Sequence, residues 1–160
     1  MSYTAIDLLD KVIYISESKK AICSVFMNEK SKNNNIRVMM NIFIKNLNKS
    51  IQYYKNLKEE IKNLPLEEID FVIYDKISFL IDTFNRKEIV TESMSAKDIL
   101  ECCLNFQKDT LALYIDIQGR LIKNENDVKA KTYKIIEDMI REKEKYVKDL
   151  EEFSNKYLKK

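Results

Sequence analysis

Three polar side chains interrupt the apolar stripes of predicted helices: Ser18, Gln107 and Lys143. Each lies near the middle of its helix, and the three helices are different. A buried polar group without a hydrogen-bond partner costs about 1–3 kcal/mol, so such groups must find partners. We therefore expect these side chains to lie in one layer of the fold, where the hydroxyls of Tyr53 and Tyr146 join them in a hydrogen-bonded plug.

Lys143 is the member of this set that carries a charge. If its ammonium is buried, a nearby carboxylate such as Glu17 is needed to make the charge tolerable. The alternative is that Lys143 snorkels, with its methylenes covering the core while the amine reaches solvent. The sequence is compatible with both arrangements.

Histidine is absent, which excludes imidazole triads, most zinc sites and Glu-x-x-His ligand pairs in their usual form. An all-carboxylate metal site is conceivable, but acidic residues that flank an apolar stripe usually face solvent. We interpret the acidic candidates in this way. They are Glu17, Asp109, Asp116, Glu137, Glu142 and Glu144.

The cysteines, Cys23, Cys102 and Cys103, are odd in number and two are adjacent, which is a poor disulfide framework. Neighbouring helical residues point about 100° apart and no redox motif accompanies the pair, so we expect Cys103 in the core. The opening "MSYTAIDLLDK" lacks the basic and apolar regions of a signal peptide. Reduced thiols in the cytoplasm are therefore expected.

The composition favours long amphipathic helices, because 160 residues contain one glycine and one proline, with 34% charged and 45% hydrophobic residues interleaved. The 28 basic and 26 acidic residues form no basic stripe, so no nucleic-acid partner is expected. No apolar run approaches the roughly 18–20 residues that span a bilayer, so no membrane partner is expected either.

Apolar spacing and capping patterns predict four long helices and a short one. The ranges are about 4–30, 35–63, 67–84 (the short helix), 96–122 and 126–157. Short turns join the first two and the last two long helices, so each pair should be antiparallel neighbours, while the longer middle connection lets the pairs lie together. This predicts one domain over residues 1–160, a four-helix bundle of ferritin-like topology, with an up-down-up-down bundle as the main competitor.

Within these helices, the predicted core stripes include Ile22, Val25 and Val72. Met39, Ile42 and Ile44 lie off the main stripe of the second helix, where they leave apolar surface that something could cover.

The segment "ILECCLNFQKDTLALYIDI" (99–117) resembles the third helix of rubrerythrin-type ferritin-like proteins. That helix has apolar residues around Glu-Lys-Asp-Ser and then an aromatic pair; this chain has Gln107 at the glutamate. The last helix, "IIEDMIREKEKYVKDLEEF", is similar to the family's Glu-x-x-His helix, with Lys143 at the glutamate and Tyr146 at the histidine. The first half is similar too. There "SKKAICSVF" and "FIKNLNKSIQYYKNL" put Ser18 at a glutamate and Ser50 and Tyr53 at a Glu-x-x-His pair.

The resemblance implies a site for two irons held by four carboxylates and two imidazoles. The positions in this chain that match the ligands are Ser18, Ser50, Tyr53, Gln107, Lys143 and Tyr146. Such cations need anionic oxygen or imidazole donors, and a protonated lysine repels them. We therefore expect neither a metal nor a cofactor nor catalytic residues, and the family's peroxidase or ferroxidase activity does not carry over.

The leading interpretation is thus a non-catalytic, degenerate ferritin-like protein, a structural or protein-interaction module that associates with itself as a dimer or larger oligomer. The alternative is an enzyme, a rubrerythrin-like oxidoreductase that binds two iron or manganese ions through an unconventional ligand set. A third possibility is a helical adaptor within a larger assembly.

Overall fold

The computed structural model describes residues 2–29, 33–87 and 94–158. These residues form five α-helices and one 3-10 helix, and no strand. The elements are α1 (Ala5–Glu29), α2 (Asn34–Ile61), α3 (Phe71–Asn85), α4 (Ala96–Arg120), the 3-10 helix η1 (Glu125–Lys129) and α5 (Lys131–Leu158). The predicted all-α class is therefore confirmed. None of the described helices combines the length and apolar character needed to cross a bilayer.

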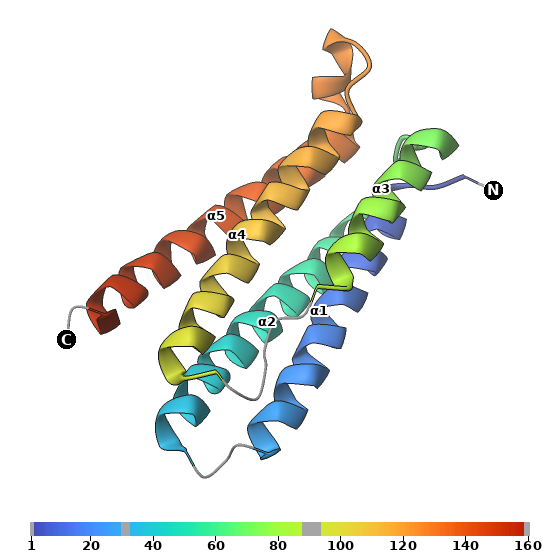
Figure 1. Ribbon diagram of the computed structural model, residues 1–160. Coiled ribbons are helices and arrows are strands. Elements are labelled where there is room, and N and C mark those ends of the chain that lie inside the picture. Colours follow the sequence, from blue (N-terminus) through green and yellow to red (C-terminus); the bar gives the residue numbers. More distant parts are fainter. Residues whose placement is uncertain (1, 30–32, 88–93, 159–160) are drawn as a thin grey trace.

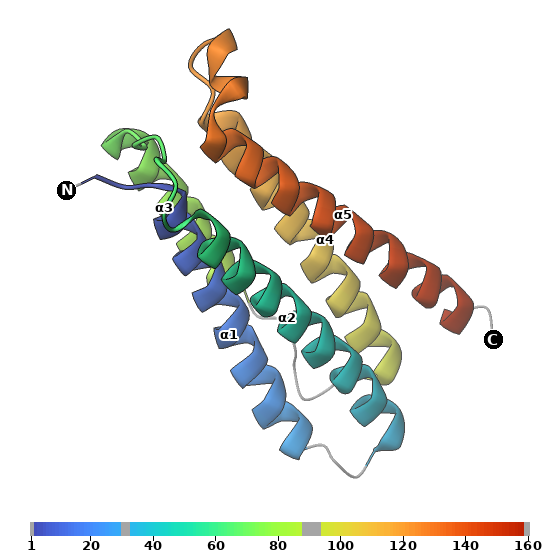
Figure 2. The same ribbon diagram turned by 180° about the vertical axis from the view of Figure 1, so that it is seen from behind.

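The long helices form two antiparallel pairs, as expected from the turns: α1 packs against α2, and α4 packs against α5 (Figure 1). The pairs meet mainly through α2 and α4, which run in the same direction, while α1 and α5 run in the opposite direction (Figure 2). The shorter α3 returns along the bundle and packs against α1 and α4.

Predicted capping patterns account for where helices begin. Before α1, the amide of Thr4 donates to the Asp7 carboxylate at 2.8 Å. Ser95 and Asp98 form a reciprocal capping box at the start of α4. Such side chains satisfy the amide groups that have no partner within the first helical turn.

The short helix begins at Phe71, not at residue 67 as predicted. Asp70 caps it by accepting hydrogen bonds from the amides of Val72 and Ile73. The residues before it are extended, and the Ile69 amide donates to the carbonyl of Tyr3 at 2.7 Å. Helical spacing of apolar residues continued through this segment, but a long-range pairing with the N-terminal residues takes precedence over it.

The last helix begins at Lys131, later than the predicted residue 126, because residues 125–129 form η1. The start of α5 is capped by a residue far away in sequence. The Glu67 carboxylate accepts hydrogen bonds from the Lys131 amide at 2.6 Å and from the Thr132 amide and hydroxyl, both at 3.2 Å.

One apolar core contains residues from all five α-helices. The predicted stripe of α1 is wrong at its C-terminal end, because Ile22 and Val25 are 52% and 58% exposed. Cys23 is buried in their place. Val72, also predicted for the core, is exposed in α3.

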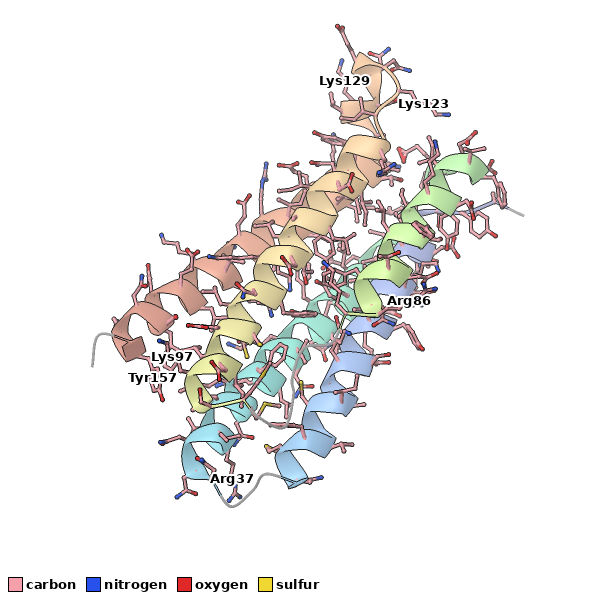
Figure 3. The ribbon with its side chains drawn as sticks, in the orientation of Figure 1. Arg37, Arg86, Lys97, Lys123, Lys129 and Tyr157 are labelled. Carbon is pink, nitrogen blue, oxygen red and sulfur yellow. The ribbon has the colours of Figure 1, made fainter. Side chains whose placement is uncertain are left out.

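The apolar surface predicted beside the main stripe of α2 is largely covered. Met39 is buried, and Ile42 and Ile44 are half-buried against the core. Basic side chains are spread over the molecule instead of forming one face. Figure 3 shows examples along its length: Lys123 and Lys129 at one end, Arg37 and Lys97 toward the other, and Arg86 between them.

A buried tyrosine pair ties α2 to α4. The hydroxyls of Tyr54 and Tyr114 are hydrogen-bonded to each other, and each residue is 2% exposed. Replacing Tyr54 with phenylalanine leaves the Tyr114 hydroxyl buried and unpaired, so we expect the free energy of unfolding to fall by about 1–3 kcal/mol. The double variant Tyr54→Phe/Tyr114→Phe should recover most of the loss in urea denaturation. Single losses that simply add in the double variant would contradict the pairing.

Candidate functional site

Lys143 lies inside the bundle and is 3% exposed. Its ammonium, on α5, donates to the Gln107 Oε1 of α4 at 2.8 Å and to the Ser50 Oγ of α2 at 3.2 Å. Polar side chains from three helices therefore meet in one layer, as the predicted plug requires. The snorkelling alternative for Lys143 is wrong.

The composition of this plug differs from the prediction in one helix. Ser50 of α2 binds the ammonium, whereas Ser18 of α1 is half-buried and is not among its hydrogen-bond partners. The buried polar residues of α1 are instead Ser16 and Lys19. Ser16 donates to the carbonyl of Val12 within its own helix.

The two tyrosines also differ from the prediction, because neither hydroxyl binds the ammonium. The Lys143 Nζ lies 5.4 Å from the centre of the Tyr146 ring, within range of a cation–π interaction. Tyr53 is half-buried nearby on α2. Burial, together with neighbouring carboxylates, raises the pKa of both tyrosines to about 12, so both phenols stay neutral.

The predicted counter-charge from Glu17 is absent from the plug. Glu17 pairs with Lys55 at 3.2 Å on the surface, and among the described residues no carboxylate lies within ion-pair distance of Lys143. Burial lowers the pKa of Lys143 to about 7, and the charge of Glu142 opposes this only in part. A cation held by neutral partners alone loses its proton easily.

The plug can accept either state of the amine. The ammonium donates hydrogen bonds to both partners, and the neutral amine can accept a hydrogen bond from the Ser50 hydroxyl. The Gln107 Nε2 is buried and has no hydrogen-bond partner in the described chain. A cavity of about 10 Å³ touches Lys143, Ser50 and Thr110, which is room for about one water molecule and for no organic substrate.

These residues do not fit a di-iron centre. A hydroxyl, an amide and an amine replace the anionic and imidazole donors that such metals need. Within the described residues, no cluster of three or more Cys, Asp or Glu side chains could hold a metal ion. Several of the acidic candidates have surface partners: Asp116 pairs with Arg120 and Glu137 with Arg141.

The cysteines are free thiols, and the prediction that Cys103 belongs to the core is confirmed. Burial raises the pKa of Cys23 to about 12 and that of Cys103 well above its usual range. Thiolates are the reactive form of cysteine, so these two positions are poor nucleophiles.

A second buried lysine was not anticipated from the sequence. Lys19 is 3% exposed and its ammonium donates to the carbonyls of Asn85 and Lys87, at 2.7 and 2.9 Å. It therefore binds the C-terminal end of α3, where helix carbonyls have no partner of their own. The adjacent Lys20 is also a lysine of the same helix, so only their positions around the helix axis distinguish the buried residue from its neighbour.

Fold and site together define an all-α protein that buries a lysine among neutral polar partners. No family model, no curated protein and no solved structure matches the chain.

The buried amine makes stability depend on pH. The folded protein loses the Lys143 proton near pH 7, whereas the unfolded chain keeps it up to the ordinary pKa of 10.5. Between these values the unfolded state binds more protons, so the free energy of unfolding rises with pH. Between pH 6.5 and pH 8.5, Lys143 adds about 2 kcal/mol to the free energy of unfolding of the natural protein. The variant Lys143→Met lacks this contribution. In urea denaturation, its free energy of unfolding should therefore rise by about 2 kcal/mol less over the same pH range.

The exposed Lys148 of the same helix provides a matched control, and Lys148→Met should keep the natural pH dependence. The comparison ends at pH 8.5 because the buried Cys23 thiol, with its raised pKa, has the opposite effect once unfolded thiols ionise. An unchanged pH dependence in Lys143→Met would show that this amine does not titrate inside the fold.

Proposed function

We propose that the chain is a ferritin-like protein without a di-metal centre, and that it acts non-catalytically as a structural or interaction module that associates with itself. The observation that carries this proposal is the meeting of Ser50, Gln107 and Lys143 in one hydrogen-bonded layer. The resemblance to rubrerythrin-type proteins assigns these positions, from sequence alone, to ligands of one metal centre. Their closeness supports the register of that resemblance in three of the helices.

The directions of the long helices support the same family. In an up-down-up-down bundle, each helix runs opposite to the one before it. Here α2 and α4 run in the same direction, and the connection between them includes α3 (Figure 1). This is the arrangement expected of ferritin-like topology with a long middle crossover.

The chemistry of the plug supports a non-catalytic role. The Lys143 ammonium puts a positive charge of the protein's own at the place that the resemblance gives to metal. Its cavity has no room for a substrate, and its donors would bind iron poorly. What the plug does supply is specific alignment of α2, α4 and α5, because a buried amine must keep its partners.

Metal analysis tests this proposal directly. We expect protein produced with added iron or manganese to retain far less than one metal ion per chain after dialysis, as measured by inductively coupled plasma mass spectrometry. Near-stoichiometric metal that resists dialysis would contradict the proposal and favour the di-metal oxidoreductase.

Restoring carboxylates should restore metal binding. The triple variant Ser50→Glu/Gln107→Glu/Lys143→Glu gathers three acidic side chains from three helices, which is the donor type that divalent cations need. We expect it to bind Mn²⁺ in calorimetry, and to gain thermal stability from it, where the natural protein does neither.

A matched control makes the same changes at exposed positions of the same helices: Gln52→Glu/Asn105→Glu/Lys145→Glu. This control changes the net charge by the same amount but does not bring the three carboxylates together inside the bundle. It should therefore not bind Mn²⁺ specifically. Equal binding by the two variants, or none by a folded triple variant, would argue against a former metal centre at the plug.

A further inference from the structure

The Gln107 side chain has one buried donor without a partner. Its Oε1 accepts a hydrogen bond from the Lys143 Nζ at 2.8 Å, and the residue is 0% exposed. Its Nε2 finds no acceptor among the described residues. Buried polar groups rarely stay unpaired, because leaving water without a new partner is costly. This amide therefore points to an acceptor beside Lys143 that the described side chains do not supply.

The Lys143 amine beside this donor is a nucleophile whenever it is neutral. Among the described residues, no carboxylate lies within ion-pair distance of it, and burial lowers its pKa to about 7. At pH 8 the amine is therefore mostly neutral, whereas an ordinary lysine, with a pKa of about 10.4, is almost fully protonated. The buried Lys19 differs, because two backbone carbonyls at the end of α3 favour its charged form.

Few charges surround the Lys143 amine. Glu142 is the carboxylate that acts on it, and Glu142 is itself paired with Lys145 at 3.8 Å. Burial raises the pKa of the tyrosines around the plug, so their phenols stay neutral: Tyr53, Tyr54, Tyr114 and Tyr146. The residues of α1 and α3 that border the cavity beside the amine carry no charge: Val12, Ile15, Ser16 and Phe84.

The cavity of about 10 Å³ at Lys143 and Ser50 restricts the electrophile to a very small one. Most of its other walls are apolar: Val12, Ile15, Leu47, Phe84, Phe106 and Leu113. Small apolar molecules enter such cavities. Carbon dioxide is apolar and has three atoms. Once its carbon is bonded to Nζ it needs less room than a free molecule, and the flexible lysine stem lets the nitrogen withdraw.

We propose that Lys143 is a carbamylation site, where the amine adds carbon dioxide and the carbamate is held by Gln107 and Ser50. The nitrogen lone pair forms a bond to the carbon, one C=O electron pair moves onto oxygen, and one N–H proton leaves to water. The product is an N-carboxylated lysine with one negative charge. No group is oxidised or reduced.

The geometry of a carbamate matches the unpaired amide. Resonance makes its N–C bond planar, as in a peptide, so one of its oxygens lies on the same side as the remaining N–H. When this N–H donates to the Gln107 Oε1, that oxygen faces the Gln107 Nε2 and accepts from it, which gives a cyclic pair of hydrogen bonds. The Ser50 hydroxyl, whose oxygen is 3.2 Å from Nζ, is the donor within reach of the second oxygen.

This modification goes beyond the proposed structural role and does not depend on self-association. It changes the charge of the plug from positive to negative. Because the reactive amine exists only in the folded chain, carbon dioxide should also stabilise the fold by mass action. One carboxylate beside an amide and a hydroxyl still falls short of the ligand set of a di-metal centre.

Carbon-13 NMR at pH 8, in sealed tubes with ¹³C-labelled bicarbonate, tests the proposal. The α-amine of the chain, with an ordinary pKa of about 7.7–8.0, gives a carbamate resonance common to all samples. We expect a second carbamate resonance in the natural protein and in the exposed control Lys148→Met, and its loss in Lys143→Met. The resonance should also disappear in urea, where Lys143 becomes an ordinary lysine.

The variant Gln107→Glu tests the positioning of the carbamate. It keeps the size of the side chain but replaces the Nε2 donor with a carboxylate oxygen, which repels the carbamate and favours the ammonium. We expect at least about a tenfold loss of the second resonance. Circular dichroism confirms that each variant is folded. A folded natural protein with the α-amine resonance alone, or a second resonance that persists in Lys143→Met, would overturn the proposal.

Discussion

The hydrogen bonds of the Lys143 ammonium to Gln107 and Ser50 are the constraint on which the arrangement of this bundle depends. An apolar core of leucines and isoleucines tolerates small shifts of one helix along another, because many packings have similar energies. A buried amine does not, because moving α5 by one turn would separate it from partners on two other helices. The plug therefore selects one relative position of α2, α4 and α5.

The hydrogen-bonded tyrosine pair is a second buried polar contact that fixes the position of α2 relative to α4. On α2, Tyr54 follows Ser50 by one helical turn, and on α4, Tyr114 follows Gln107 by two turns. Because α2 and α4 run in the same direction, two polar contacts lie one above the other between them. Both are buried; burial raises the pKa of both tyrosines, so their hydroxyls stay neutral, whereas the Lys143 amine loses its proton near pH 7.

The helices of the fold were largely predictable, because apolar spacing and capping residues act locally. The plug was predictable only in part. Gln107 and Lys143 are buried, as expected. The stripe of α1, in contrast, drifts by about one residue, so that Lys19 and Cys23 face inward where Ser18 and Ile22 were expected. The burial of Lys143 depends on where α2 places Ser50, and no local pattern contains that information.

The segment at 67–70 was misread for the same reason. Its apolar spacing continues that of α3, and only contacts with residues far away in sequence keep it extended. Long-range contacts of this kind decide the ends of elements more often than their centres.

The cap that Glu67 provides for α5 couples the two halves of the chain during folding. The hairpin of α4 and α5 can form from neighbouring residues, but the first turn of α5 completes its hydrogen bonds only with a carboxylate 64 positions upstream of Lys131. Fraying of the last helix and detachment of the α2–α3 connection are thus one cooperative event. In hydrogen exchange, amide protection at the start of α5 should follow that of the connection rather than that of its own helix centre.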